Sequence, residues 1–204
     1  MNGDIDHGGK AGSLVDEKKR YHSLIIVLHW LMALGIFAML ASGAAMTTLE
    51  LDQSLKFKLY QWHKGGGVLL LIAFGLRLIT RLITVIPEWP SAMPKKERFA
   101  AKTGHWGLYI LMIVMPLSGW MMVSSSVYGL PTIVFDLFEW PHIPGIESNR
   151  TVHDLAKSAH YWLAILFALM IAGHIGAVIK HAVMDQQNLL HRIWWGNHKN
   201  PDDK

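Results

Sequence analysis

Histidines supply most of the metal-binding capacity of this sequence. Its 204 residues include 12 histidines and 11 methionines but no cysteine. The absence of cysteine excludes disulfides, thiolate zinc sites, iron–sulfur clusters and thioether-linked haem. A bound metal would therefore have to use imidazole, thioether or carboxylate ligands.

Five of the histidines fall within or at the entry of long apolar stretches: His29, His63, His105, His160 and His174. An ionisable residue inside a membrane span is a functional candidate by default, because burying it in lipid is costly. His160 and His174 are fourteen residues, or two heptads, apart. In a left-handed bundle they face the same direction, roughly 21 Å apart along the helix. One helix thus presents two imidazoles, one near each side of a membrane.

Four apolar runs in the sequence are long enough to cross a bilayer, which takes about 20 residues. The chain is 51% hydrophobic and 17% charged, whereas about a quarter of the residues in soluble domains are charged. Basic residues separate the apolar runs and form no continuous stripe, which argues against a nucleic-acid partner. No strand-like alternation and no internal repeat stands out. The sequence predicts an all-α integral membrane four-helix bundle, with spans near 23–46, 61–83, 104–125 and 158–179.

The distribution of Lys and Arg predicts how this bundle is oriented. Thirteen of the 19 basic residues lie in the terminal tails and around the 84–103 loop, and five lie around the two opposite loops. By the positive-inside rule both termini are cytoplasmic. The predicted organisation is a cytoplasmic tail (1–20), a transmembrane domain (21–183) and a second cytoplasmic tail (184–204). The loops on the outer side are 47–60 and 127–157, and the second is expected to form an ordered cap.

Each of the two imidazoles on the fourth span needs a partner at its own depth. Because spans one and three run outward and spans two and four inward, His63 and His160 both lie near the outer surface. His29 and His174 both lie near the inner surface. The topology therefore predicts two pairs, His63–His160 outside and His29–His174 inside, each suited to be the axial ligands of one haem b.

Residues fourteen positions after the other histidines fit the same arrangement. Gly43 and Gly119 fall at the outer level, where a flat macrocycle needs missing side chains, and Gly65, Gly66, Gly67, Gly173 and Gly176 are further candidates. Arg77 falls at the inner level and is suited to pair with a haem propionate, because guanidinium matches carboxylate. Iron with both axial positions filled favours electron transfer over activation of bound dioxygen.

Simpler roles compete with each of these assignments. A lone histidine inside a membrane is more often a hydrogen-bonding group between helices than a ligand. His153 lies seven residues before His160 and is an alternative outer ligand, and Arg77 is long enough to snorkel to the interface. No sixth histidine lies at the depth of His105 to pair with it. Its possible roles are therefore a hydrogen bond to a propionate, a proton path or plain packing.

Several segments in order resemble the bacterial cytochrome b561 family over roughly residues 20–192. The resemblance implies a four-helix dihaem b protein of the bacterial inner membrane that exchanges electrons with quinone. It also implies haem ligands at His29, His63, His160 and His174, in agreement with the pairing by topology. The matching segments are Leu28-His29-Trp30-Leu31, Trp62-His63-Lys64 with Arg77 and Arg81, Gly104-His105, and His160-Tyr161-Trp162 with His174.

The expected function is transmembrane electron transfer between the quinone pool and a periplasmic redox partner. By the resemblance, one specific form is superoxide oxidation coupled to ubiquinone reduction. The alternative is a cytochrome b subunit that anchors a periplasmic oxidoreductase or hydrogenase, and a haem or metal transporter is a third class. The outer loops with Lys64 carry six acidic and five basic residues, so no broad positive surface attracts an anion. The sequence assigns no catalytic residue and is compatible with a monomer or a homodimer.

Overall fold

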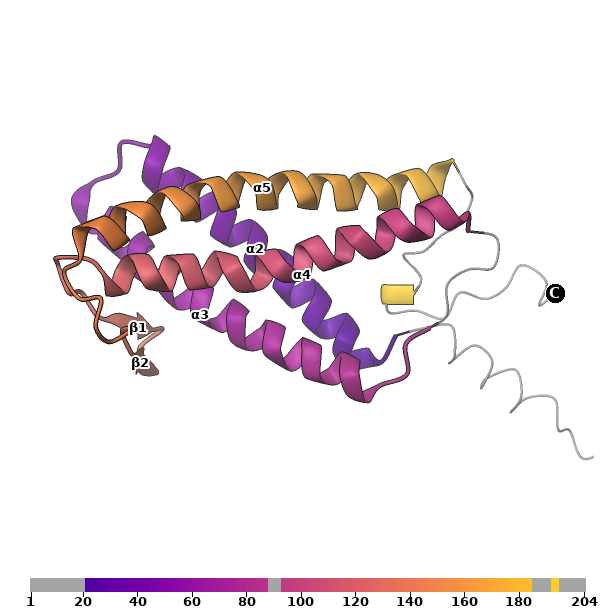
Figure 1. The fold of residues 1–204 in the computed structure, drawn as a ribbon, viewed down its shortest axis with the longest axis horizontal. Coiled ribbons are helices and arrows are strands. Elements are labelled where there is room, and N and C mark those ends of the chain that lie inside the picture. The colour runs from indigo at the N-terminus through magenta and orange to yellow at the C-terminus, as the bar shows by residue number, and fades with distance from the viewer. Residues whose placement is uncertain (1–20, 88–92, 185–191, 195–204) are drawn as a thin grey trace, which may run out of the picture.

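A computed structural model describes residues 21–87, 93–184 and 192–194 of the chain. In this part of the chain four long helices run side by side (Figure 1). The predicted N-terminal tail, 1–20, and most of the predicted C-terminal tail, 184–204, lie outside the described residues. The helices are α2 (Ser23–Thr48), α3 (Gln53–Ile83), α4 (Lys95–Ser124) and α5 (Arg150–Val183).

All four helices are long and apolar enough to cross a membrane, as the sequence predicted. Three of the helices extend well beyond the predicted spans, because polar residues continue them past the apolar segments. Asp52 caps α3 by accepting hydrogen bonds from the backbone of Ser54 and Leu55, and Asn149 caps α5 in the same way. The prediction of a loop at 47–60 is therefore wrong. This segment is mostly helix, and only residues 49–52 connect α2 to α3.

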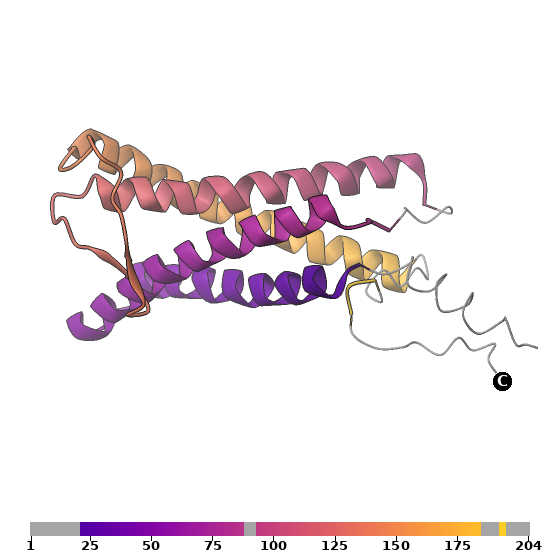
Figure 2. The same ribbon diagram turned by 90° about the horizontal axis from the view of Figure 1, so that it is seen from below.

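The helices pack chiefly as neighbours in sequence, α2 against α3 and α4 against α5, with α3 against α4 joining the two halves. One end of the bundle, here called the hairpin end, carries the α2–α3 turn and the long connection between α4 and α5. The opposite end, here called the terminal end, carries the start of α2 and the end of α5. Both views place the two ends at opposite limits of the long axis (Figures 1 and 2).

The connection between α4 and α5 contains a small β-hairpin that the sequence did not predict. Strands β1 (Thr132–Val134) and β2 (Phe138–Trp140) are antiparallel, with Thr132 opposite Trp140. Each strand has only three residues, too few to show an alternating pattern. The turn between them also lacks the usual glycine signal, because the non-glycine residues Phe135 and Asp136 adopt positive φ.

Polar and apolar contacts fasten this connection to the helices as an ordered cap. Val134 is fully buried where β1 packs on α3. Lys64 Nζ donates to the carbonyl of Pro131 at 2.7 Å, and the Trp120 indole donates to the carbonyl of Pro141 at 2.7 Å. These contacts seat the cap on both α3 and α4. Further along the same connection, hydrogen bonds from the backbone N–H groups of Glu147 and Gly145 lower the pKa of the exposed Glu147 carboxyl.

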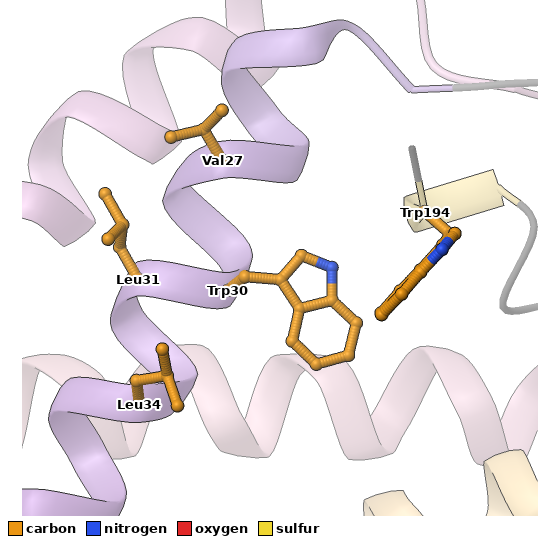
Figure 3. Close-up of a pocket in the computed structure, with 5 residues that line it drawn as sticks. All are labelled: Val27, Trp30, Leu31, Leu34 and Trp194. Atoms are coloured by element: carbon orange, nitrogen blue, oxygen red, sulfur yellow. The ribbon is translucent and has the colours of Figure 1, made fainter. Parts of the chain in front are cut away.

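A short turn at residues 192–194 packs on α2 at the terminal end. The Trp30 indole donates to the carbonyl of Ile193 at 2.8 Å, and its ring meets that of Trp194 edge to face, with the centroids 5.3 Å apart. Figure 3 shows these two side chains beside a shallow groove of about 360 Å³. Apolar side chains line the groove, so it suits an acyl chain and offers no polar group for chemistry.

Candidate functional site

At the hairpin end, His63 on α3 and His160 on α5 face each other across the bundle. Their ring centroids are 6.2 Å apart and the rings are inclined by 74°. A Cβ on Gly43 would lie 3.4 Å from His63, and one on Gly119 would lie 3.0 Å from His160. The structure therefore brings together the predicted outer pair and places both predicted glycines against its rings.

At the terminal end, His29 on α2 and His174 on α5 form the second pair. Their ring centroids are 6.5 Å apart and the rings are inclined by 62°. His105 on α4 lies at the same level, with its ring centroid 5.6 Å from that of His174. Arg77 on α3 completes this group, with Nη1 2.9 Å from Nδ1 of His29.

The ring separations test whether an iron ion fits between the paired histidines. A metal lies about 2 Å from each imidazole nitrogen, which lies about 1.1 Å from its ring centre, so two axial imidazoles have centroids about 6.2 Å apart. The separations of 6.2 and 6.5 Å match this value, whereas the 5.6 Å between His105 and His174 is shorter. The described residues contain no cluster of three or more His, Asp or Glu suited to a metal ion. A metal at either pair would therefore need further ligands, such as the four nitrogens of a porphyrin.

The contact between Arg77 and His29 constrains what the second pair can do. A guanidinium only donates hydrogen bonds, so Nδ1 of His29 must accept. A neutral imidazole that accepts at Nδ1 carries its proton on Nε2, where it has no free lone pair. This contact and ligation of a metal by neutral His29 therefore exclude each other. The predicted pairing of Arg77 with a propionate would remove the conflict, because it moves the guanidinium onto a carboxylate.

The nearest contacts of the other predicted glycines and of His153 are not the rings of the two pairs. Gly65 faces the backbone of β1, and Gly66 and Gly67 face the side chain of Met39, so these glycines accommodate the hairpin and helix packing. A Cβ on Gly173 or Gly176 would meet no atom within 4 Å. His153 has its Nδ1 2.9 Å from the carbonyl of Met122, and the ring that faces His63 is that of His160.

Two serines that sequence reasoning missed contact the hairpin-end pair. Ser42 Oγ lies 2.9 Å from Nδ1 of His63, and Ser118 Oγ lies 2.9 Å from Nδ1 of His160. Each serine directly precedes one of the two glycines that face the same rings. The signal was present in the sequence as a short repeat, Met-x-x-Ser-Gly-x-x-Met, at residues 39–46 and 115–122. The expectation that the chain has no internal repeat was wrong at this scale.

A cleft of about 410 Å³ opens between α3 and α4 near the terminal end. Its walls include lipid-facing apolar side chains, such as Leu82, Trp106 and Ile110. Its polar lining comprises Arg81, Lys102, His105 and Tyr109. The Arg81 guanidinium lies 5.7 Å from the centre of the Tyr109 ring, as in a cation–π contact. Because His105 neighbours His174, the cleft reaches from the lipid face to the second histidine pair.

Comparison with known proteins agrees with this arrangement. The family model of prokaryotic cytochrome b561 matches residues 20–196, nearly the whole chain. The chain belongs to the prokaryotic cytochrome b561 family. Cytochrome b561 homolog 2 of Escherichia coli (strain K12) is 30% identical over 182 residues, covering 89% of this chain and 94% of that protein. Probable superoxide oxidase CybB of Yersinia pestis is 27% identical over 180 residues, covering 84% and 94%.

Membership of the cytochrome b561 family confirms the family and fold expected from the sequence. The protein is a multi-pass protein of the bacterial inner membrane, and its family carries out membrane electron transfer with b-type haem. The chain covers almost all of these relatives, so the family's fold applies to the whole described bundle. The assignment of individual histidines as ligands stays a prediction.

The two glycines that face the hairpin-end rings differ in clearance, which predicts a graded response. If the predicted haem lies between these two rings, Gly119→Ala should lower its content, because the new Cβ would lie 3.0 Å from the His160 ring and overpacking costs about 1–3 kcal/mol. Gly43→Ala, with 3.4 Å of clearance, should be milder. Haem per polypeptide measures both, with Gly75→Ala, which meets no atom within 4 Å, as the control. Full haem content in Gly119→Ala would contradict the packing argument.

Proposed function

We propose that this cytochrome b561 transfers electrons across the membrane between the quinone pool and a periplasmic redox partner. Each histidine pair would hold one haem b, with His63 and His160 at the hairpin end and His29 and His174 at the terminal end. The ring separations of 6.2 and 6.5 Å are the observation that carries this proposal. When bound between two imidazoles, each haem supplies a one-electron centre with no open coordination site.

In this proposal both termini are cytoplasmic and the hairpin end faces the periplasm. The support is the excess of Lys and Arg around the terminal end, which by the positive-inside rule lies in the cytoplasm. The hairpin-end pair is then the outer pair and the terminal-end pair the inner one. Electrons therefore enter or leave beneath the ordered cap on one side and near the α3–α4 cleft on the other.

The charged residues of the inner level have separate roles in this proposal. Arg77 neutralises a haem propionate by a charge-assisted hydrogen bond and thereby leaves His29 free to ligate. His105 lies beside His174, where it is placed to donate a hydrogen bond or a proton. The shorter separation between these two rings argues against His105 as the axial partner of His174.

We assign the quinone site to the α3–α4 cleft. A quinone is an apolar ligand that diffuses in lipid, and the cleft opens between lipid-facing side chains. The carbonyl oxygens of a quinone accept hydrogen bonds. Donors for them are present in the cleft lining, on Arg81, Lys102, His105 and Tyr109. Reduction of one quinone takes two electrons and two protons, and His105 and Lys102 are the groups placed to relay protons from the cytoplasm.

Superoxide is the specific outer substrate that we propose, since the Yersinia pestis relative is named a probable superoxide oxidase. Two superoxide anions would each lose one electron to give two molecules of dioxygen, and one quinone would become one quinol. The outer surface offers at most local attraction, because Lys64 already donates to Pro131 while Arg150 and Lys157 are exposed.

One observation favours the second candidate, a cytochrome subunit for a periplasmic oxidoreductase. The cap carries several large apolar side chains exposed outside the spans, which is typical of a protein interface. A stable complex with a second polypeptide of defined stoichiometry would support this role. The exposed residues include Val127, Tyr128, Leu130, Leu137 and Phe138.

Histidine replacement tests the ligand assignment directly. His63→Ala or His160→Ala should remove only the outer haem, and His29→Ala or His174→Ala only the inner one. The haem content should fall from about two to about one per polypeptide in each case, because one axial ligand is lost. Reduced-minus-oxidised spectra with haem quantification measure this. His105→Ala is the control and should keep both haems. If this variant lost the inner haem, His105 would be an inner ligand in place of His29 or His174.

Filling the cleft tests the quinone site. Leu78→Trp places a larger side chain in the cleft lining, and Leu166→Trp places the same side chain on an exposed position of α5. Overpacking of about 1–3 kcal/mol should slow haem reduction by a short-chain quinol about tenfold or more in the first variant only. Stopped-flow absorbance follows the rate, and dithionite shows that both haems are intact. Equal rates in the two variants would place the quinone elsewhere.

Purified protein tests the identity of the outer substrate. An enzymatic superoxide source should reduce the bound haem, and superoxide dismutase should abolish the reduction. Added ubiquinone should then reoxidise the haem with two superoxide anions consumed per quinol. If a quinol reduces the bound haem but superoxide does not, superoxide is excluded as the substrate. That result would favour the role of a subunit for a periplasmic oxidoreductase.

A further inference from the structure

The hydrogen bonds of Ser42 and Ser118 determine which nitrogen of each outer histidine carries the proton. A serine hydroxyl has one hydrogen to donate. Ser42 Oγ lies 3.0 Å from the carbonyl of Met39, and Ser118 Oγ lies 2.7 Å from the carbonyl of Met115. A carbonyl only accepts, and two oxygens this close repel each other unless a hydrogen lies between them, so we assign each hydroxyl hydrogen to the backbone of its own helix.

With that hydrogen committed, each Oγ can interact with the neighbouring imidazole only as an acceptor. The Nδ1 atoms of His63 and His160, both 2.9 Å from a serine Oγ, must therefore be the donors. A neutral imidazole protonated at Nδ1 leaves Nε2 with a free lone pair. This assignment gives both outer rings the tautomer that coordinates a metal through Nε2.

We infer that Ser42 and Ser118 are positioning residues that fix the tautomer and rotation of the two outer haem ligands. The inference rests on the proposed function, since it concerns the ligands of the outer haem. Histidines that ligate metals usually donate their second ring N–H to an acceptor, which makes the imidazole a stronger donor to the metal. The oxidised iron is stabilised by this donation, so the two serines lower the midpoint potential of the outer haem.

The arrangement around the inner pair is chemically opposite. No serine accepts from Nδ1 of His29 in the described structure: its partner there is the Arg77 guanidinium, which in the proposed function moves to a propionate and remains beside the inner haem as a cation. A neutral acceptor strengthens electron donation by the imidazole, whereas a nearby cation disfavours positive charge on the iron. The two levels therefore differ in a direction that makes the outer haem the easier one to oxidise.

The sequence around the serines supports a built site. The motif Met-x-x-Ser-Gly-x-x-Met occurs on α2 and again on α4, two helices that run in the same direction. In both copies the serine bonds the ring and the glycine gives it room. A serine that bonds back to its own helix is also common in membrane proteins for structural reasons alone. The experiment must therefore separate ligand positioning from helix stability.

Redox titration of the full-length protein separates the two roles. Ser42→Ala, Ser118→Ala and the double variant should raise the midpoint potential of one haem and leave the other unchanged, with the largest shift in the double variant. The Thr variants keep a hydroxyl and should restore the original potential. Ser125→Ala is the matched control, because Ser125 is buried at the C-cap of α4, its hydroxyl bonds back to the carbonyl of Met121, and no hydrogen bond joins it to a histidine among the described residues.

Each result decides the inference. A raised midpoint potential of one haem in the Ala variants supports the inference. Loss of the outer haem in the Ala variants, with both haems kept in the Thr and Ser125→Ala variants, supports it equally. Unchanged potentials in the double variant, or equal shifts of both haems, would overturn it. Failure of the proposed function is distinguishable, because wild-type protein would then lack two low-spin haems before any serine is changed.

Discussion

The fourteen-residue offset between His160 and His174 is the constraint on which the remaining arrangement depends. It places two imidazoles on one face of α5, at two depths of an apolar bundle where an unpartnered polar group is costly. Each depth is then completed by the other helices: α3 supplies His63 at one level, and α2 supplies His29 at the other. The glycines and serines of α2 and α4 follow from the same requirement, since the rings need both space and a hydrogen-bond partner.

Much of the fold and of the site was predictable because both depend on periodicities. Apolar runs of bilayer length fix the number of helices, and heptad spacing fixes which histidines share a face. The helix ends were less predictable, because Asp52 and Asn149 begin helices in polar segments that hydropathy assigns to loops. The hairpin was missed because its strands are short and its turn uses Phe135 and Asp136 in place of glycine.

The serines were missed for a different reason. Serine is an ordinary residue in membrane helices, and its importance here lies in which of its bonds are already used. The committed hydroxyl of Ser118, for example, appears only when the carbonyl of Met115 and the ring of His160 are both placed. The contact of Arg77 with His29 is similar: the sequence predicted a partner for an anion at this depth, but only the structure shows that Arg77 also bonds Nδ1 of His29, a proposed haem ligand.

The run of residues 63–67 on α3 has a consequence for recombination among relatives. Within five consecutive positions, His63 faces His160, Lys64 bonds the cap, Gly65 seats β1, and Gly66 and Gly67 admit Met39. The proposed outer ligand and the residues that hold the cap are thus adjacent on one helix, although the cap itself lies some seventy positions later in the chain. A chimaera that exchanges the cap for that of another family member would have to exchange this run with it, so the two segments are expected to be inherited together.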